Sequence, residues 1–549
     1  MSIEVRRRTV LAAGGAAAIA AGAAACGGGS TTSGGASKSA DVTLPTYQAL
    51  EGLTPDLEGS EDGLHSVFLK APEKLLTTVD KKPITSGAVS ALTETFDTPP
   101  PAMKDNPFWQ RLNEALGGDL NLTIAVDAGG GYPEKFATTL ASGDLPDLMW
   151  VPPNQGIPNI GPMLESQFTD LTPYLEGDKV LEWKNLAALK PGSWRTAVVN
   201  GKIWGAPIPS TPFGQVYLGN PTLWDEVGGF QPSSADDFLE KCKAISQPGK
   251  VWALEPALIN ALHMFGEWFG APNGYRVNKD RTLNSRFQTD EYREAIEFAA
   301  KVWKAGAFYP DVNLAEGQQM FAAGTLGAVV AVGPRSASGY RSQNPDLLAD
   351  IMIPFAAVEG RTPVYDMGYG TVGFTPLKKT DDEKKIRELL DLINYLSAPF
   401  GTVEFMQKNF GTEGEDYEIK DGNYVRTAAG EQNAPGLVSA LTIMASGESV
   451  IYNPNPDDSK YIYEQEKLLL ELAMQSPVKG LYSDTSSAKG SELNSKMNDV
   501  IQEVIQGRKT MDDYDAAVKE WEEKGGKKIL EEFAAVLPED VPVTPDPKA

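Results

Sequence analysis

Short apolar runs alternate with amphipathic helical stretches from about residue 60 onward, and Gly or Pro residues separate them. The pattern predicts strands at 84–92, 120–126 and 145–151, with helices at 107–116 and 135–142 between them. Alternation of this kind predicts an α/β fold.

Two later helices carry start signals. Ser233 or Ser234 caps a helix at 235–245, and Thr510 caps a helix that runs to 524, because an acidic residue follows each cap by three positions. A Gly pair at 525–526 is expected to end the second helix. No internal repeat and no long linker divides the chain after residue 60, so the lobes of the fold are expected to interleave.

The N-terminus has the pattern of an export signal. Arg7 and Arg8 precede Thr9, Val10 and Leu11, as in a twin-arginine signal, and an Ala/Gly-rich core follows. Small residues then precede Cys26, as at a lipoprotein cleavage site; the alternative is ordinary cleavage after an Ala-x-Ala sequence. Because a Gly/Ser/Thr stretch follows Cys26, we expect a lipid anchor and a flexible tether. The folded part is then expected on the outer face of the cell membrane.

The composition argues against several classes of function. With 41% apolar and 22% charged residues the chain is globular, and a net charge of −25 disfavours nucleic-acid binding. The two histidines, His65 and His263, and the two cysteines, Cys26 and Cys242, are too few for a Cys/His zinc site or a CxxC redox pair. We therefore expect no cofactor and no metal.

Catalytic motifs give little support to an enzyme. The sequence has no Gly-x-Ser-x-Gly elbow and no phosphate-binding P-loop. Residues 368–373 fit Gly-x-Gly-x-x-Gly, but an extended segment follows them, so the glycines are expected to allow close backbone approach. His263 lies in an apolar stretch and is expected to be structural. The oxygen-rich segment 453–458 lacks the calcium-loop pattern and is expected to be a solvated loop, with a calcium site as the alternative.

Aromatic residues remain as the candidate binding chemistry. Five of them stand where strands end or loops begin: Trp150, Trp204, Trp268, Tyr275 and Tyr369. Flat rings that stack on sugars are typical of carbohydrate clefts, although for any single ring core packing is the alternative.

Seven segments occur in one order between about residues 80 and 537 and resemble a known family. They are 141–148, 170–175, 200–207, 269–275, 321–328, 410–417 and 505–514. The most specific are Asn-Gly-Lys-Ile-Trp-Gly-Ala-Pro at 200–207 and Phe-Gly-x-Glu-Gly-x-x-Tyr at 410–417. Together they resemble the extracellular solute-binding lipoproteins of ABC importers, in the large oligosaccharide-binding branch with the LplA/LipO-type and alginate-binding proteins. The chain departs from many relatives at 217–220 and at Tyr275, so the resemblance does not identify one ligand.

The resemblance implies the two-lobed periplasmic-binding-protein fold of type II, with a sugar enclosed between the lobes by hinge closure. After a signal peptide at 1–25 and a tether at 26–59, one lobe is expected at 60–212 plus 364–428. The other is expected at 213–363 plus 429–549. Arg335 follows a Gly-Pro pair and resembles the position that stacks on sugar in the maltose-binding branch. There it can contact a uronate carboxylate, with a surface ion pair as the alternative.

We therefore expect a monomeric, non-enzymatic, lipid-anchored receptor that delivers an oligosaccharide to an ABC permease. Trp150, Trp204, Trp268, Arg335 and Tyr369 are expected to line its cleft. A binding protein for peptides or other solutes and a secreted glycoside-active enzyme are the alternatives.

Overall fold

The structure is a computed structural model that describes residues 42–126, 131–153, 157, 159–312, 317–344 and 346–548. Contacts divide the chain into Met1–Gly35 and Ala36–Ala549, and every described residue belongs to the second unit. The predicted export signal with Arg7 and Arg8, and the predicted lipidation site Cys26, lie outside the described residues. Within the described part, no helix combines the length and the apolar character needed to cross a bilayer.

The first sheet has three parallel strands in the order β3-β2-β4. Its elements are β2 (Ala88–Thr95), β3 (Asp119–Val126), β4 (Leu148–Met149) and the connecting helix α1 (Pro107–Leu116). Asn106 caps α1 by accepting a hydrogen bond from the Trp109 amide at 3.1 Å, and Gly117 ends the helix with a φ of +88°. The helix predicted at 107–116 is confirmed, whereas the strand predicted at 84–92 lies at 88–95.

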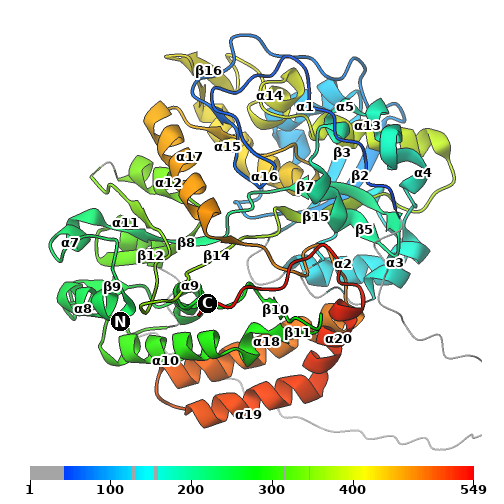
Figure 1. The fold of residues 1–549 in the computed structure, drawn as a ribbon. Helices are drawn as coiled ribbons and strands as arrows, with labels where there is room; N and C mark the ends of the chain where they lie inside the picture. The colour runs from blue at the N-terminus through cyan, green and yellow to red at the C-terminus, as the bar shows by residue number, and fades with distance from the viewer. Residues whose placement is uncertain are drawn as a thin grey trace, which may run out of the picture. The chain divides into compact units, whose positions relative to one another are not determined.

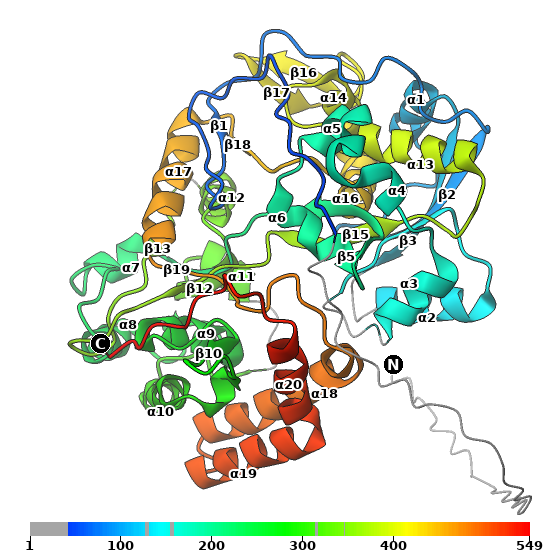
Figure 2. The ribbon, with the colours of Figure 1, turned by 45° about the vertical axis from the view of Figure 1, so that its right-hand side comes forward.

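Helices from distant parts of the chain surround this sheet (Figure 2). They are α2 (Gly131–Ser142), α3 (Ile160–Gln167), α4 (Thr172–Leu175), α5 (Lys184–Ala187), α6 (Pro191–Trp194), α13 (Glu383–Leu396), α14 (Val403–Asn409), α15 (Ala428–Asn433) and α16 (Pro435–Met444). Leu437, Leu441 and Met444 of α16 are buried in the same core as Leu120 and Leu390. Helix α16, which follows the lobe boundary expected at 428/429, thus packs against β2 within this core.

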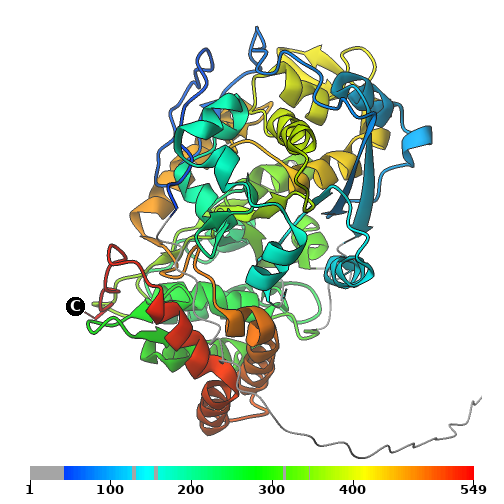
Figure 3. The ribbon, with the colours of Figure 1, turned by 90° about the vertical axis from the view of Figure 1, so that its right-hand side faces the viewer.

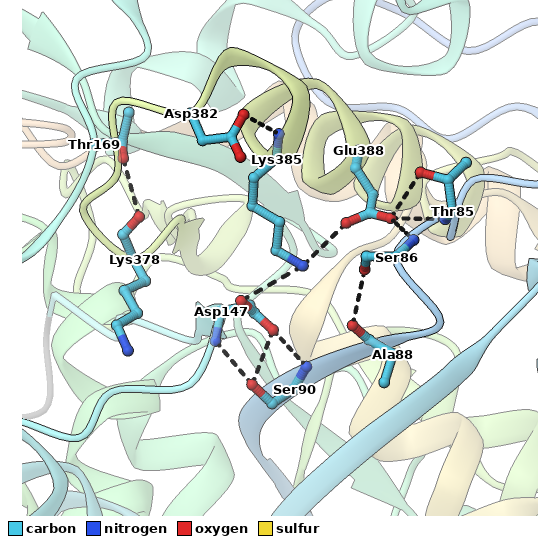
Figure 4. A network of polar contacts seen from close by, with 10 residues as sticks. All are labelled: Thr85, Ser86, Ala88, Ser90, Asp147, Thr169, Lys378, Asp382, Lys385 and Glu388. Carbon is cyan, nitrogen blue, oxygen red and sulfur yellow. Dashed lines mark hydrogen bonds and ion pairs between the residues drawn. The ribbon is translucent and has the colours of Figure 1, made fainter.

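A polar network ties α13 to the start of the first sheet (Figure 4). Glu388 accepts hydrogen bonds from the backbone amides of Thr85 at 2.7 Å and Ser86 at 2.6 Å. The ammonium group of Lys385 bonds Glu388 at 3.0 Å and lies 3.6 Å from Asp147, which in turn accepts from the Ser90 amide. These polar contacts hold α13 to the loop before β2.

The second sheet has four strands in the order β13-β8-β12-β9, of which only β12 and β9 are parallel neighbours. Its strands are β8 (Gln215–Gly219), β9 (Trp252–Leu254), β12 (Leu326–Val332) and β13 (Asp350–Met352). The elements around it are α7 (Pro221–Asp225), α8 (Ala235–Ile245), α9 (Leu258–Phe269), α10 (Asp290–Lys304), α11 (Gly317–Ala322), α12 (Ser336–Gln343) and the hairpin β10 (Tyr275–Val277) and β11 (Leu283–Ser285). Ser234 caps α8 through the Asp237 amide at 3.2 Å, as predicted.

Three C-terminal helices pack side by side, and the first of them packs against α9 and α10 (Figures 1 and 2). They are α18 (Asp484–Ile505), α19 (Met511–Trp521) and α20 (Lys527–Ala535). Thr510 and Asp513 form the predicted capping box of α19. The helix that starts with α19 breaks at the Gly pair as predicted, because Gly525 has a non-helical φ of +152°, and α20 begins after this kink. A Cβ on Gly526 would lie 2.3 Å from the Trp521 ring, so the Gly pair allows this tight junction.

Short paired strands link the two sheets. They are β7 (Gly205–Pro209) with β15 (Thr371–Pro376), β14 (Tyr365–Asp366) with β19 (Ala473–Met474), and β1 (Val67–Phe68) with β18 (Ile451–Tyr452). The remaining elements are β5 (Val198–Val199), β6 (Lys202–Ile203), β16 (Tyr417–Lys420), β17 (Asn423–Arg426) and α17 (Pro456–Glu471). The N-terminal segment runs beside α17 (Figures 2 and 3), where the buried His65 ring bonds Glu466 through Nδ1 at 2.8 Å.

Candidate binding cavity

A cavity of about 720 Å³ lies between the elements that surround the first sheet and those that surround the second. Its floor comes from the turn before β15, from the first half of β15 and from the segment around β5; the lining residues there are Tyr369, Thr371, Gly373, Phe374, Thr196, Val198 and Val199. Helix α9, the β10–β11 hairpin and the turn at 286–288 form one wall, and α18 forms another. The volume lies within the range of small-molecule sites, which is about 300–1,000 Å³.

Helix α18 presents a polar face to the cavity. Ser483, Ser487, Gly490, Asn494 and Asn498 follow one another at intervals of three or four residues and all line it. The adjoining face of α18 is apolar and buried in the core, through Leu493, Met497 and Ile501 among others. The apolar spacing indicates a helix, but only packing shows that its small polar residues face a cavity.

Aromatic rings complete the lining. They are Tyr275, Phe287, Tyr292, Tyr369, Phe374, Tyr482, Trp521 and Phe533. Tyr369 is 37% exposed, which makes it the most accessible of them among the described residues. Rings beside serine hydroxyls and asparagine amides can hold a ligand that has both apolar faces and many hydroxyl groups.

One charged cluster lies at the cavity wall. The Arg286 guanidinium donates to His263 Nδ1 at 3.2 Å and lies 3.8 Å from the Asp366 carboxylate. Glu267, which is 2% exposed, accepts from the Asp366 amide at 2.9 Å. Among the described residues, His263, Glu267 and Asp366 offer ligand atoms within 4.8 Å of one another, as a metal site would need. The neighbouring Arg286 guanidinium disfavours a metal ion between these three residues, because it already supplies a positive charge there.

Burial sets the protonation of this cluster. It lowers the pKa of His263 to about 3, with the Arg286 charge acting in the same direction, so the ring is neutral at pH 7. Burial raises the pKa of both Glu267 and Asp366, and for Glu267 the Asp366 charge adds to the effect. The two carboxyl groups therefore hold protons more readily than exposed ones, and Arg286 offsets the negative charge that is left.

The Gly-rich segment 368–373 shapes the cavity floor. Gly373 has a φ of +138°, and a Cβ there would lie 2.4 Å from the Val151 carbonyl oxygen and 2.8 Å from the Trp150 indole nitrogen. This agrees with the expected role of the glycines in close backbone approach. Tyr369 lies in the turn before β15 and lines the cavity.

Three of the predicted binding residues do not line this cavity. Trp150, Trp204 and Trp268 are at most 2% exposed. Their side chains belong to apolar cores, and the indoles of Trp150 and Trp204 donate to the carbonyls of Val372 and Val199 at 3.2 and 2.9 Å. These positions agree with the alternative of core packing, because each ring lies inside an apolar core. A ligand contact for them stays a prediction without support from this arrangement.

Arg335 also lies away from the cavity lining. Its guanidinium bonds Ser449 Oγ at 3.0 Å, and its Nε lies 4.0 Å from the buried Glu466 carboxylate. Burial lowers the pKa of Arg335, and the Glu466 charge opposes this. An ion pair with the buried Glu466 thus describes Arg335 better than an open sugar contact. In the segment 453–458, Asn455 caps α17 and Asp458 pairs with Arg341, which engages these oxygens within the fold.

The comparisons with known proteins agree with this architecture. A family model described as bacterial extracellular solute-binding protein matches residues 110–412. Lipoprotein LipO of Bacillus subtilis (strain 168) is 23% identical over 461 residues, covering 78% of this chain and 88% of LipO. The polygalacturonan/rhamnogalacturonan-binding protein YtcQ of the same organism is 20% identical over 449 residues, covering 77% of this chain and 86% of YtcQ.

A solved structure supports the fold. The HMO-binding, ABC-transporter-associated solute-binding protein of Bifidobacterium longum infantis superimposes with a TM-score of 0.60 at 16% identity, covering 82% of this chain and 98% of that one. The α/β fold is thus the type II periplasmic-binding-protein fold that the sequence implied. The family binds solutes and is not catalytic, which is the expected class. With a family model that covers more than half of its length, the chain belongs to the bacterial extracellular solute-binding proteins.

Proposed function

We propose that this protein captures an oligosaccharide in the 720 Å³ cavity and delivers it to an ABC transporter permease. The lining carries the proposal: it combines stacking rings such as Tyr369 with the serine and asparagine face of α18. Sugars present apolar ring faces and hydroxyl edges, which are the surfaces that these two groups complement. The names of YtcQ and of the Bifidobacterium protein, which state polygalacturonan or HMO binding, support a saccharide ligand.

A ligand panel tests this. Thermal unfolding is followed in the presence of oligosaccharides, oligopeptides and small solutes. A bound ligand at about 100 times its dissociation constant adds roughly 2.7 kcal/mol to stability, so its unfolding temperature rises. We expect a response to saccharides alone. A response only to peptides would favour the peptide-binding alternative, and chain shortening of the saccharides would favour a glycoside-active enzyme.

Binding is proposed to close two lobes over the ligand. The lobes correspond to 60–212 plus 364 to about 445, and to 213–363 plus the rest of the chain, as the membership of α16 in the first core suggests. Small-angle scattering then shows a smaller radius of gyration at saturating ligand. An unchanged radius argues against hinge closure.

The export signal and the anchor are the remaining parts of the proposal. Changing Arg7 and Arg8 to Lys is expected to leave precursor in the cytoplasm, and Cys26→Ala is expected to release the exported protein from the membrane fraction. The name of the LipO relative as a lipoprotein supports the anchor. Unimpaired export of the double-Lys variant would exclude the twin-arginine route.

A further inference from the structure

We propose that Arg195 and Lys479 form a subsite for the carboxylate of an acidic oligosaccharide, so that the ligand of this protein contains uronate residues. This inference rests on the proposed function and specifies its ligand class. It assigns the acidic contact to a different place from Arg335, which lies outside the cavity lining.

The two cations lie in a small cavity of about 170 Å³ that adjoins the large one. Its lining is Val42, Leu44, Arg195, Val198, Lys479, Gly480 and Leu481. Val198, Gly480 and Leu481 also line the large cavity. The two cavities are therefore neighbours that share these three lining residues.

Close backbone approach brings both cations to this boundary. A Cβ built on Gly480 would lie 3.1 Å from Cβ of Arg195, so residue 480 packs directly on the Arg195 stem. A Cβ on Gly370 would lie 3.8 Å from the Lys479 ammonium nitrogen. Gly370 stands between Tyr369 and Thr371, which both line the large cavity. The Lys479 ammonium thus lies behind the same turn that carries the most accessible ring.

The charges of this pair are not compensated by the described part of the chain. Neither Arg195 nor Lys479 has an ion-pair partner among the described residues, and no described residue that lines the small cavity is acidic. Arg286 and Arg335, in contrast, each lie within 4.0 Å of a buried carboxylate. In a protein with a net charge of −25, two neighbouring cations without an acidic partner indicate a place for an external anion.

Electrostatics favours a bound carboxylate at this position. Burial lowers the pKa of Lys479, and the positive charge of Arg195 lowers it further. A carboxylate between them would offset both effects, because an opposite charge stabilises each cation. Arginine can hold a carboxylate through two parallel hydrogen bonds, and lysine adds a compact charge. A neutral sugar has a hydroxymethyl group where a uronate has this carboxylate, so the subsite distinguishes the two classes.

Titration calorimetry on the mature protein tests the inference with matched ligands. Oligomers of galacturonate, mannuronate and guluronate are compared with their methyl esters, which keep the linkage and remove the charge. At least one acid is expected to bind about tenfold more tightly than its ester, with an affinity that falls as salt increases.

Variants then locate the effect. Lys479→Met and Arg195→Gln are each expected to weaken the acid about tenfold and to leave the ester unchanged, whereas Lys479→Arg retains most of the preference. Lys496→Met serves as the matched control, because Lys496 is exposed on α18 and pairs with Glu492. Thermal unfolding without ligand confirms that the variants are folded.

The outcomes separate the two proposals. Binding of neutral saccharides without a preference for acids, or an acid preference that survives in both variants, overturns the carboxylate subsite and leaves the proposed function intact. Failure of acidic and neutral saccharides alike to bind overturns both.

Discussion

Replacing Trp150 by Ala decides whether this ring is part of the core or a platform for the ligand. Trp150 follows β4, is 1% exposed and packs against Tyr132 with ring centroids 4.8 Å apart. Its indole N–H donates to the Val372 carbonyl at 3.2 Å, directly before Gly373 in the cavity floor. The ring therefore supports the floor from behind.

The expected loss of folding stability follows from the size of the buried ring. Truncating a buried Trp to Ala typically costs about 3–5 kcal/mol, from lost burial and the cavity left behind. The Val372 carbonyl also loses its partner, which is included in the upper part of that range. Trp150→Phe keeps a ring against Tyr132 and removes the N–H, so we expect a smaller loss of about 1–2 kcal/mol.

Urea unfolding followed by far-ultraviolet circular dichroism, without ligand, measures the loss of stability. Calorimetric titration of a bound oligosaccharide on the same variants measures affinity. We expect both midpoints to fall, more for Ala than for Phe, and the folded fraction of Trp150→Phe to bind within a few-fold of the native protein. The reasoning is refuted if Trp150→Ala unfolds at the native midpoint while its affinity falls tenfold or more.

Three further changes test other parts of the structure. Tyr369→Ala is expected to weaken saccharide binding about tenfold with little effect on stability, because this ring is 37% exposed in the cavity; unchanged affinity in calorimetry would exclude it as a contact. Burial opposes ionisation of Glu388, but bonds from Lys385, Thr85 and Ser86 lower its pKa from 4.5 to about 2, so its stabilisation is complete above about pH 4.5 and is lost as the pH falls towards 2. Glu388→Gln should make the unfolding midpoint less dependent on pH in that window. The same pH dependence in both proteins would argue against the network. His65→Ala is expected to cost about 2 kcal/mol or more, because Glu466 is left buried without its nearest hydrogen-bond donor; denaturation at the native midpoint would contradict this.

The local elements of the fold followed from short stretches of sequence. Asn106 and Gly117 delimit α1, and Thr510 starts α19, because a helix cap needs only contacts within about four residues. The break between α19 and α20 was predictable in the same way. The Gly pair separates the two helices, since Gly525 has a non-helical φ of +152°, and the ring of Trp521 packs on Gly526.

The order of the seven family-like segments also determined the fold class, since they extend over most of the chain. It did not determine the direction in which a side chain points. Trp150 and Tyr369 both stand beside strand ends, yet one ring is buried in the core and the other is in the cavity. The difference arises from β15, which passes in front of Trp150 and comes from a part of the chain far along the sequence.

The binding cavity itself was decided by tertiary structure. His263, Arg286 and Asp366 come from α9, the turn after β11 and β14, and only packing brings them together. Arg195 and Lys479 are likewise distant in sequence and meet where Gly480 allows the two segments to touch. Helical periodicity indicates which residues share a face, but which neighbour covers that face depends on how all the layers pack at once.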